Sequence, residues 1–257
     1  MPPKRVALIC GAVWFGFSTA GMAQEKLNVS SSDSVPARPA AKGDEPPLKP
    51  TSNPEVQKLL GEAQDLQGRH RYFDALAKLD EAEKLAPNDP NIYNIRGAIY
   101  LVPAVREFDK AKEQFEKAKS MEPTALAPKF NLAELQFVKH SFAEAEAAFA
   151  AVLKEYTKLQ MSIRHLVVFK LLVSQAEQGK IDEANATLKT HFTFMDDTPA
   201  YYFSKATLAF VQKNEAAAKE WLEKANSIFK PGENAPYLDS LMETRHIPNI
   251  MIPPEAK

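Results

Sequence analysis

The chain has almost no cysteine and little glycine. Its 257 residues include one cysteine, Cys10, and nine glycines. Cys10 lies in an apolar N-terminal segment, so the rest of the chain has no thiol, which excludes disulfides and thiolate metal sites there. Alternating β-branched stretches are scarce, whereas alanine, lysine, glutamate and leucine are abundant. This composition favours helix through nearly all of the ordered part.

An excess of positive charge is also lacking. The chain carries 32 basic and 33 acidic residues, a formal net charge of −1. Without Lys4 and Arg5, 30 basic residues stand against 33 acidic ones, a charge of about −3. A chain with this balance has no basic field for nucleic acid, and we expect no nucleic-acid partner.

Motifs that would indicate an enzyme are missing as well. There is no glycine-rich phosphate loop and no serine in a strand-to-helix elbow. The histidines are scattered, and no two are four residues apart, as a helical zinc pair would be: His70, His140, His165, His191 and His246. Asp196-Asp197 precedes Pro199 and is typical of a turn or helix cap. We therefore predict no enzymatic activity, no cofactor and no metal.

The N-terminus is typical of a secretory signal. Lys4 and Arg5 precede a nearly unbroken run of apolar and small residues over 6–20, and Gly21 and Ala23 are small enough for signal peptidase. We expect a signal peptide over 1–23 and a periplasmic or extracellular mature protein. The alternative is an uncleaved membrane anchor, because the run is nearly long enough to span a bilayer. Either way, the rest of the chain faces outside the cytoplasm.

Residues 24–53 have the composition of a linker. They hold five prolines and a cluster of serines with almost no large apolar residue. We expect this segment to be disordered and extended.

A regular repeat follows, from residue 54 to residue 230. An alanine recurs with spacings of 36, 34, 39 and 34 residues: Ala75, Ala111, Ala145, Ala184 and Ala218. Four residues after each alanine stands a large apolar residue: Leu79, Phe115, Phe149, Leu188 and Leu222. Three further on stand Ala82, Ala118, Val152, His191 and Ala225. These offsets place all three sets on one helical face, and the period predicts small helical units that stack on one another.

Turn and cap residues divide each unit into two helices. The first pair is expected over Glu55–Gln67 and Tyr72–Leu85, the second begins at Pro90, and the fifth opens at Thr198-Pro199. Pro231-Gly232 is expected to end the array. The remaining residues, 231–257, should form a short helix near Tyr237–Met242 and an apolar tail that lies along the array.

These units resemble the tetratricopeptide repeat. In the second unit the pattern is carried by Tyr93, Gly97, Tyr100, Phe108, Ala111, Phe115, Ala118 and Pro123. The first, third and fifth units repeat most of it, and the fourth, with Leu172 and His191 at positions that are usually small, matches least. The resemblance implies an all-α fold, an α-solenoid of about five antiparallel helix pairs in a right-handed superhelix.

The resemblance also implies where a partner would bind. The first helix of each pair lines the concave side, and the residues expected to face inward are Asn94, Phe130, Asn131, Glu134, Phe137, Phe169, Phe203, Thr207 and Phe210. The five phenylalanines either form a groove for an apolar segment of a partner protein or pack between neighbouring units. A third possibility is that the tail over Ile247–Pro253 fills the groove itself.

Some members of the family bind a terminal carboxylate with basic residues on the inner face. At the matching positions this chain has other residues, among them Leu60, Ile95 and Ala127. We predict an exported, non-enzymatic scaffold that binds a protein or peptide through its concave face. The alternative is a membrane-tethered adaptor in a cell-envelope or secretion assembly. A carbohydrate or small-ligand binder would require the inner aromatic residues to be exposed.

Overall fold

Eleven α-helices make up the part of the chain that the computed structural model describes, residues 48–49, 51–192, 195 and 198–248. Within these ranges there is no strand. The expected signal peptide, most of the linker, Asp196-Asp197 and the end of the apolar tail lie outside the described residues. The helices are α1 (Pro54–Gly68), α2 (Tyr72–Leu85), α3 (Pro90–Leu101), α4 (Phe108–Met121), α5 (Leu126–Val138), α6 (Phe142–Glu155), α7 (Met161–Glu177), α8 (Ile181–His191), α9 (Pro199–Val211), α10 (Glu215–Ile228) and α11 (Pro231–Glu243).

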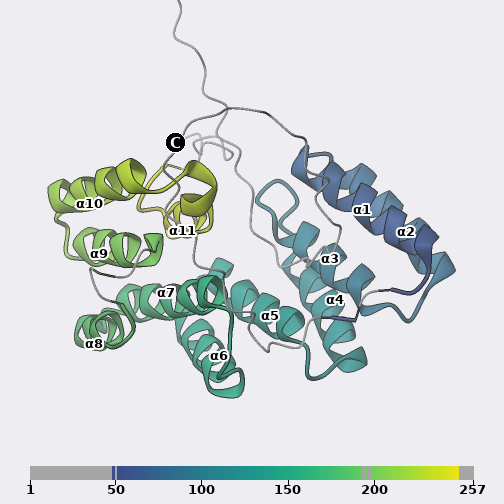
Figure 1. The fold of residues 1–257 in the computed structure, drawn as a ribbon, viewed down its shortest axis with the longest axis horizontal. Helices are drawn as coiled ribbons and strands as arrows, with labels where there is room; N and C mark the ends of the chain where they lie inside the picture. Colours follow the sequence, from purple (N-terminus) through teal and green to yellow (C-terminus); the bar gives the residue numbers. More distant parts are fainter. Residues whose placement is uncertain (1–47, 50, 193–194, 196–197, 249–257) are drawn as a thin grey trace, which may run out of the picture.

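The helices pair as the sequence predicts and follow one another around an arc (Figure 1). Side-chain caps precede α3 and α9. Asp89 accepts a hydrogen bond from the Asn91 amide at 2.9 Å, and Thr198 accepts one from the Ala200 amide at 3.3 Å. Each cap precedes a proline in the first turn, where the missing amide proton costs nothing.

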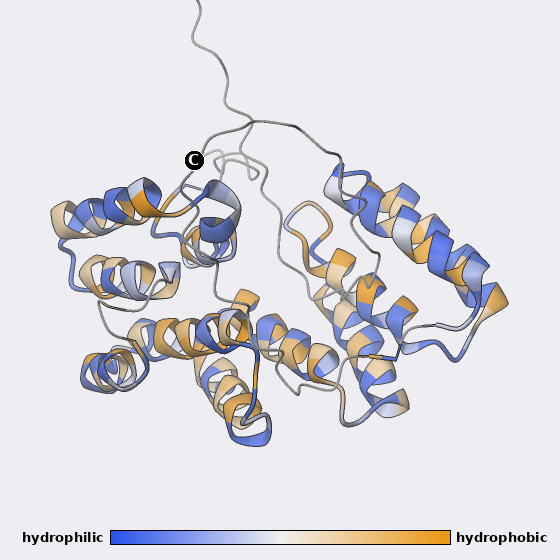
Figure 2. Ribbon diagram, viewed as in Figure 1, coloured by the Kyte–Doolittle hydropathy of each residue, from blue (hydrophilic) through white to orange (hydrophobic). Residues whose placement is uncertain are grey.

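The recurring alanines lie where helices touch. All five are fully buried, and so are Leu79, Phe115 and Phe149, which follow three of them. In the fourth unit Ala184 and Leu188 are buried, but His191 is partly exposed at the end of the short helix α8. Apolar and polar residues alternate around the second helices (Figure 2), so that each helix buries one stripe.

The second unit shows how close the helices approach. A Cβ atom added to Gly97 of α3 would lie 2.6 Å from the Phe115 ring of α4. Phe115 is fully buried, so the side chains around it restrict its ring. The absence of a side chain at position 97 is therefore what allows α3 and α4 to pack at this distance.

Most turns within a pair use one left-handed residue. His70, His140, Gly179 and Lys213 have φ between 58° and 76°. The next residue then donates its amide proton to a carbonyl near the end of the preceding helix, as Ser141 does to Gln136 at 2.9 Å. The α3–α4 turn is longer and has Arg106 at φ 47°.

Helix α11 ends in the same way as a first helix. Arg245 has φ 63°, and the His246 amide donates to the Leu241 carbonyl at 3.0 Å. It is thus the first helix of a sixth unit that has no second helix in the described residues. The expected helix over Tyr237–Met242 was too short, because Pro231-Gly232 does not stop the array; Pro231 occupies the first turn of α11 instead.

The close approach at Gly97 yields a prediction with a matched control. Gly97→Ala should lower the free energy of unfolding by about 1–2 kcal/mol, because overpacking against Phe115 outweighs the gain in helix propensity. Gly61→Ala, in the middle of α1 with nothing within 4 Å of the added Cβ, should raise it by about 0.5–1 kcal/mol. Urea unfolding of both variants measures the difference; equal shifts would contradict the contact at Gly97.

Candidate functional site on the inner face

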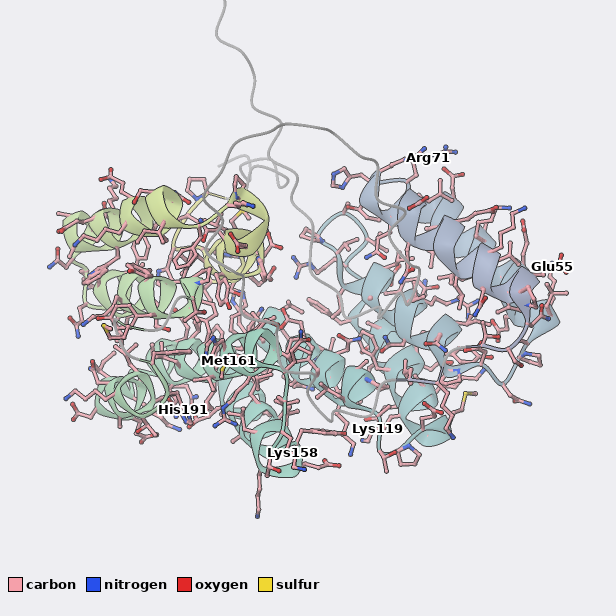
Figure 3. All side chains as sticks on the ribbon, in the orientation of Figure 1. Glu55, Arg71, Lys119, Lys158, Met161 and His191 are labelled. Atoms are coloured by element: carbon pink, nitrogen blue, oxygen red, sulfur yellow. The ribbon has the colours of Figure 1, made fainter. Side chains whose placement is uncertain are left out.

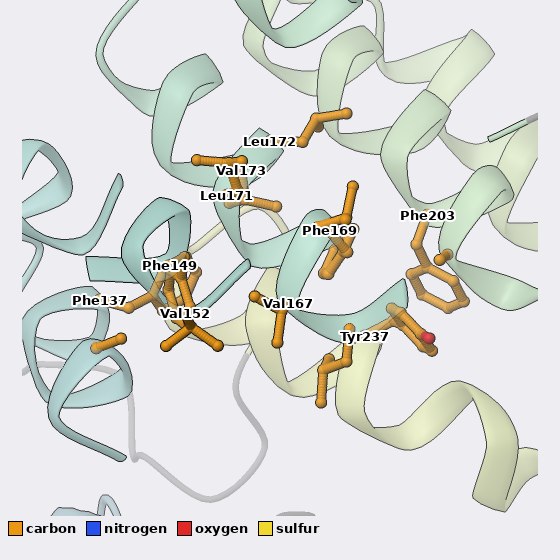
Figure 4. Packing of buried hydrophobic residues seen from close by; sticks show 14 of the residues in the cluster. Phe137, Phe149, Val152, Val167, Phe169, Leu171, Leu172, Val173, Phe203 and Tyr237 are labelled. Atoms are coloured by element: carbon orange, nitrogen blue, oxygen red, sulfur yellow. The ribbon is translucent and has the colours of Figure 1, made fainter. Parts of the chain in front are cut away.

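Four of the five phenylalanines that were expected to face inward are buried. Phe130, Phe137, Phe169 and Phe203 have exposed fractions of 0–3% and belong to one apolar cluster (Figure 4). The Phe130 and Phe137 rings lie 5.8 Å and 6.4 Å from the ring of Phe149 on the second helix of the same unit. This burial favours the alternative that these rings pack between helices, so they offer no exposed aromatic surface to a groove or a sugar.

The fifth phenylalanine, Phe210, is only partly buried. Its ring stacks on the imidazole of His246, with centroids 5.2 Å apart and planes 9° from parallel. A residue beyond α11 therefore covers the end of α9.

Three of the four polar residues that were expected to face inward make hydrogen bonds between neighbouring units, and the fourth, Thr207, does not. Asn131 Nδ2 donates to Asn94 Oδ1 at 2.8 Å, and Lys170 Nζ donates to Glu134 Oε1 at 2.6 Å. These pairs are 37 and 36 residues apart, so they connect equivalent faces of successive first helices. Thr207 instead donates to the Phe203 carbonyl in its own helix.

Helix α11 lies against the first helices α7 and α9. The ring of Tyr237 is 5.1 Å from that of Phe169 and 5.5 Å from that of Phe203 (Figure 4). Leu241, one turn later, is fully buried in the same cluster. The structure therefore has α11 on the phenylalanines of the inner face. Of that tail, Ile247 packs against the cluster, and residues 249–253 lie outside the described range.

The C-terminal end of α11 is held by charged groups from distant units. Arg106, in the α3–α4 turn, donates two hydrogen bonds to the Glu243 carboxylate, at 2.8 Å and 3.1 Å. His140 Nε2, in the α5–α6 turn, donates to the main-chain carbonyl of Glu243 at 2.9 Å. The Arg106 cation and the His140 hydrogen-bond donor therefore lie at the C-terminal end of α11, which is the negative end of the helix dipole.

A further contact follows α11. His246 Nε2 lies 2.5 Å from Glu177 Oε1 at the end of α7. Arg106, His140 and Glu177 belong to three successive units, and Phe203 of α9 adds a fourth, so α11 and its end touch four successive units of the array.

The middle of α11 brings an acidic group into this buried face. Burial raises the pKa of Asp239 to about 6; the nearby Lys170 ammonium opposes the rise, and the Glu134 and Glu243 carboxylates add to it. Asp239 Oδ2 and Glu134 Oε2 are buried and accept no hydrogen bond from the described residues. Burial likewise raises the pKa of Tyr237 to about 12, although a hydrogen bond with Thr198 opposes this, so the phenol is neutral at physiological pH.

Sequence reasoning did not identify Arg106, Tyr237, Asp239 or Glu243. Tyr237 and Glu243 come from the segment after the last complete repeat, where the pattern ends. Arg106 lies in a turn that the repeat pattern leaves unspecified. The only local signal is the four-residue spacing of Tyr237 and Leu241, which predicts a shared helical face.

A second group of charges joins α2, α3 and α4, where Arg96 pairs with Asp80 and Glu83. Other charged residues are dispersed. Glu55, Arg71, Lys119 and Lys158 project from separate helix ends and turns (Figure 3). In the described ranges no three or more His, Cys, Asp or Glu residues are grouped so that they could hold a metal ion. No helix among the described residues is long and apolar enough to cross a bilayer.

Solved structures with the same arrangement of helices are tetratricopeptide-repeat proteins. One, from Parabacteroides merdae, superposes with a TM-score of 0.57 at 17% identity, over 74% of this chain and 71% of its own. A thermophilic protein of Thermus thermophilus gives 0.55 at 20% identity, over 73% and 99%. PilW, a type IV pilus biogenesis factor, gives 0.57 at 19% identity, over 76% and 90%.

The chain has the tetratricopeptide-repeat fold. The all-α solenoid that the resemblance implies is thereby confirmed. No family model and no curated protein sequence matches this chain. At identities of 20% or less, the likeness extends to the fold alone.

The buried carboxyl of Asp239 predicts a pH dependence. The native state holds the Asp239 proton more tightly than the unfolded chain does. The free energy of unfolding should therefore fall as the pH rises from the ordinary pKa of 3.8 to about 6. Asp239→Asn removes the buried charge and should stabilise the protein by about 1–3 kcal/mol at pH 7, with the gap closing towards pH 4.

The control is Asp65→Asn on the exposed side of α1, which should change stability by less than about 0.5 kcal/mol at either pH. Thermal melts at pH 4 and pH 7 measure both variants. A stabilisation by Asp239→Asn that is the same at both pH values would rule out the buried charge as its cause.

Proposed function

We propose that this chain is an exported, non-enzymatic scaffold that binds a partner protein or peptide through the inner face of its repeats. The observation that carries the proposal is the position of α11. The inner face already holds one helix, with Tyr237 packed between Phe169 and Phe203 and Glu243 paired with Arg106. A surface that accepts an amphipathic helix of its own chain has the shape and the apolar anchors to accept one from a partner.

The fold supports the same role. A stack of helix pairs presents a long curved surface, and each unit adds to it without needing a catalytic centre. The charge of the chain supports a protein partner rather than nucleic acid.

The alternative proposal is a membrane-tethered adaptor in a cell-envelope or secretion assembly. It is favoured by the length of the apolar run over 6–20, which would act as an anchor if it were retained. A pilus biogenesis factor with the same fold supports it as well. The two proposals share the inner face and differ only in what happens to the N-terminus.

Photocrosslinking tests the inner face. A photoreactive phenylalanine analogue replaces either Phe210, partly buried on the inner side, or Phe73, which is 77% exposed on α2. In the source organism, the analogue at position 210 should give a discrete crosslinked protein, and the analogue at position 73 should not. A product from position 73 alone, or equal yields of one product from both, would contradict binding at the inner face.

The fate of the N-terminus is tested by mass spectrometry of the protein isolated from its source. A mature N-terminus at Gln24 supports the exported scaffold. An intact first segment that begins at Met1 and stays in the membrane fraction would overturn it in favour of the tethered adaptor.

A further inference from the structure

The inner face between α7 and α9 recognises α11 by two sets of side chains. Tyr237 and Leu241 are four residues apart and enter the apolar cluster, whereas Asp239 and Glu243, also four apart, approach charged groups. We define the α11 seat as the residues that receive them: Phe169, Phe203, Lys170, Glu134 and Arg106. These residues belong to four successive units: α11 packs on α7 and α9, and charged groups of its later half reach the second and third units.

The α11 helix does not complete the seat. Asp239 brings a carboxyl group into a buried place where Glu134 and Glu243 already act on it. One oxygen of Asp239 and one of Glu134 remain buried without a hydrogen-bond donor from the described residues. Two buried acceptors without a donor weaken the docking of α11.

The preceding helix α10 holds the start of α11 through one side chain: Asn234 Nδ2 donates to the Ala225 carbonyl at 3.4 Å and to Asn226 Oδ1 at 3.0 Å. Within the described residues no second helix follows α11, so the structure shows none of the cover that a second helix gives each earlier first helix. The first turn of α11, Pro231–Glu233, is exposed, and Pro236 lies inside the helix and removes one main-chain donor. A segment held along one face and by a few side chains at its two ends can leave as a unit.

We propose that the α11 seat is a docking site for an amphipathic helix of a partner protein, which displaces α11. The chemistry of the seat specifies that helix. It carries an aromatic residue and, counted from this residue, a neutral hydrogen-bond donor at position +2, an aliphatic residue at +4 and an acidic residue at +6. The aromatic and aliphatic residues replace Tyr237 and Leu241, and the acid pairs with Arg106. The neutral donor, an asparagine or glutamine, supplies the hydrogen bond that Glu134 lacks.

This inference rests on the proposed function and names the partner's chemistry at the same face. It also predicts competition. The apparent affinity for a partner helix equals the intrinsic affinity multiplied by the fraction of molecules in which α11 has left the seat. Any change that loosens α11 therefore strengthens the binding of a partner helix.

A labelled peptide tests the competition. The probe is a fluorescent peptide of residues 229–248 that carries Asp239→Asn, titrated by anisotropy against the full chain and against the full chain with Glu243→Gln. Glu243→Gln in the protein removes the carboxylate that Arg106 holds, so the probe should bind this variant about tenfold more tightly than the wild type. The same Glu243→Gln change in the peptide should weaken its binding about fivefold.

Glu243→Gln should thus raise the affinity when it is made in the protein and lower it when it is made in the peptide. This opposition is expected only if α11 and the peptide compete for the same seat. A peptide that also carries Tyr237→Ser should not bind. Equal affinity of the probe for both proteins, or no binding to the Glu243→Gln protein, would overturn the inference. If Glu243→Gln lowers the helical content, amide hydrogen exchange of the wild-type protein replaces the titration. Excess probe should speed exchange in residues 231–243 and leave exchange in residues 54–68 unchanged. No acceleration in 231–243 would overturn the inference.

The two proposals fail separately. A crosslinked partner at position 210 together with a peptide that does not bind would remove the helix-exchange proposal and leave the inner-face scaffold. Loss of the position-210 crosslink with a peptide that does bind would remove the natural partner at this position and leave the seat.

Discussion

The close contact between paired helices at small residues is the constraint on which the rest of the structure depends. The five recurring alanines are fully buried, and at Gly97 even one added carbon would meet the Phe115 ring at 2.6 Å. Helices that approach this closely bury one stripe each, but a single pair leaves its other apolar side uncovered. Each unit must therefore pack on its neighbours, which produces the curved array and leaves both its ends and its inner side to be covered.

Helix α11 is the consequence at the C-terminal end. It begins and ends as a first helix does, but no second helix follows it in the described residues, so its apolar face turns to the nearest uncovered surface. Tyr237 packs against Phe169 and Phe203, and Glu243 reaches Arg106, which lies 137 residues earlier in the chain. The same helix thereby covers the C-terminal part of the array and occupies the face on which partner binding was expected.

The sequence allowed the repeat to be predicted because its signals are local. The alanine spacing, the cap at Asp89 and the cap at Thr198 each act within one or two helices, and each is present in the structure. The spacing could not decide whether the inner phenylalanines are exposed or buried, because a first-helix residue such as Phe137 can face solvent or pack against Phe149 of its own unit. The pairing of Arg106 with Glu243 has no local signal, and Pro231 reads equally as the end of one helix or the start of the next.

The central claim is that the C-terminal helix folds back onto the inner face and is held by the second unit. It is tested most directly by a chain with Cys10→Ser, Arg106→Cys and Glu243→Cys, treated with a short bis-maleimide crosslinker at low protein concentration. The account predicts a rapid crosslink within one chain, and none in the matched chain that carries Arg71→Cys in place of Arg106→Cys. Crosslinking of Arg106→Cys to Glu243→Cys that is no faster than in this control, or that occurs only between chains, would contradict the account.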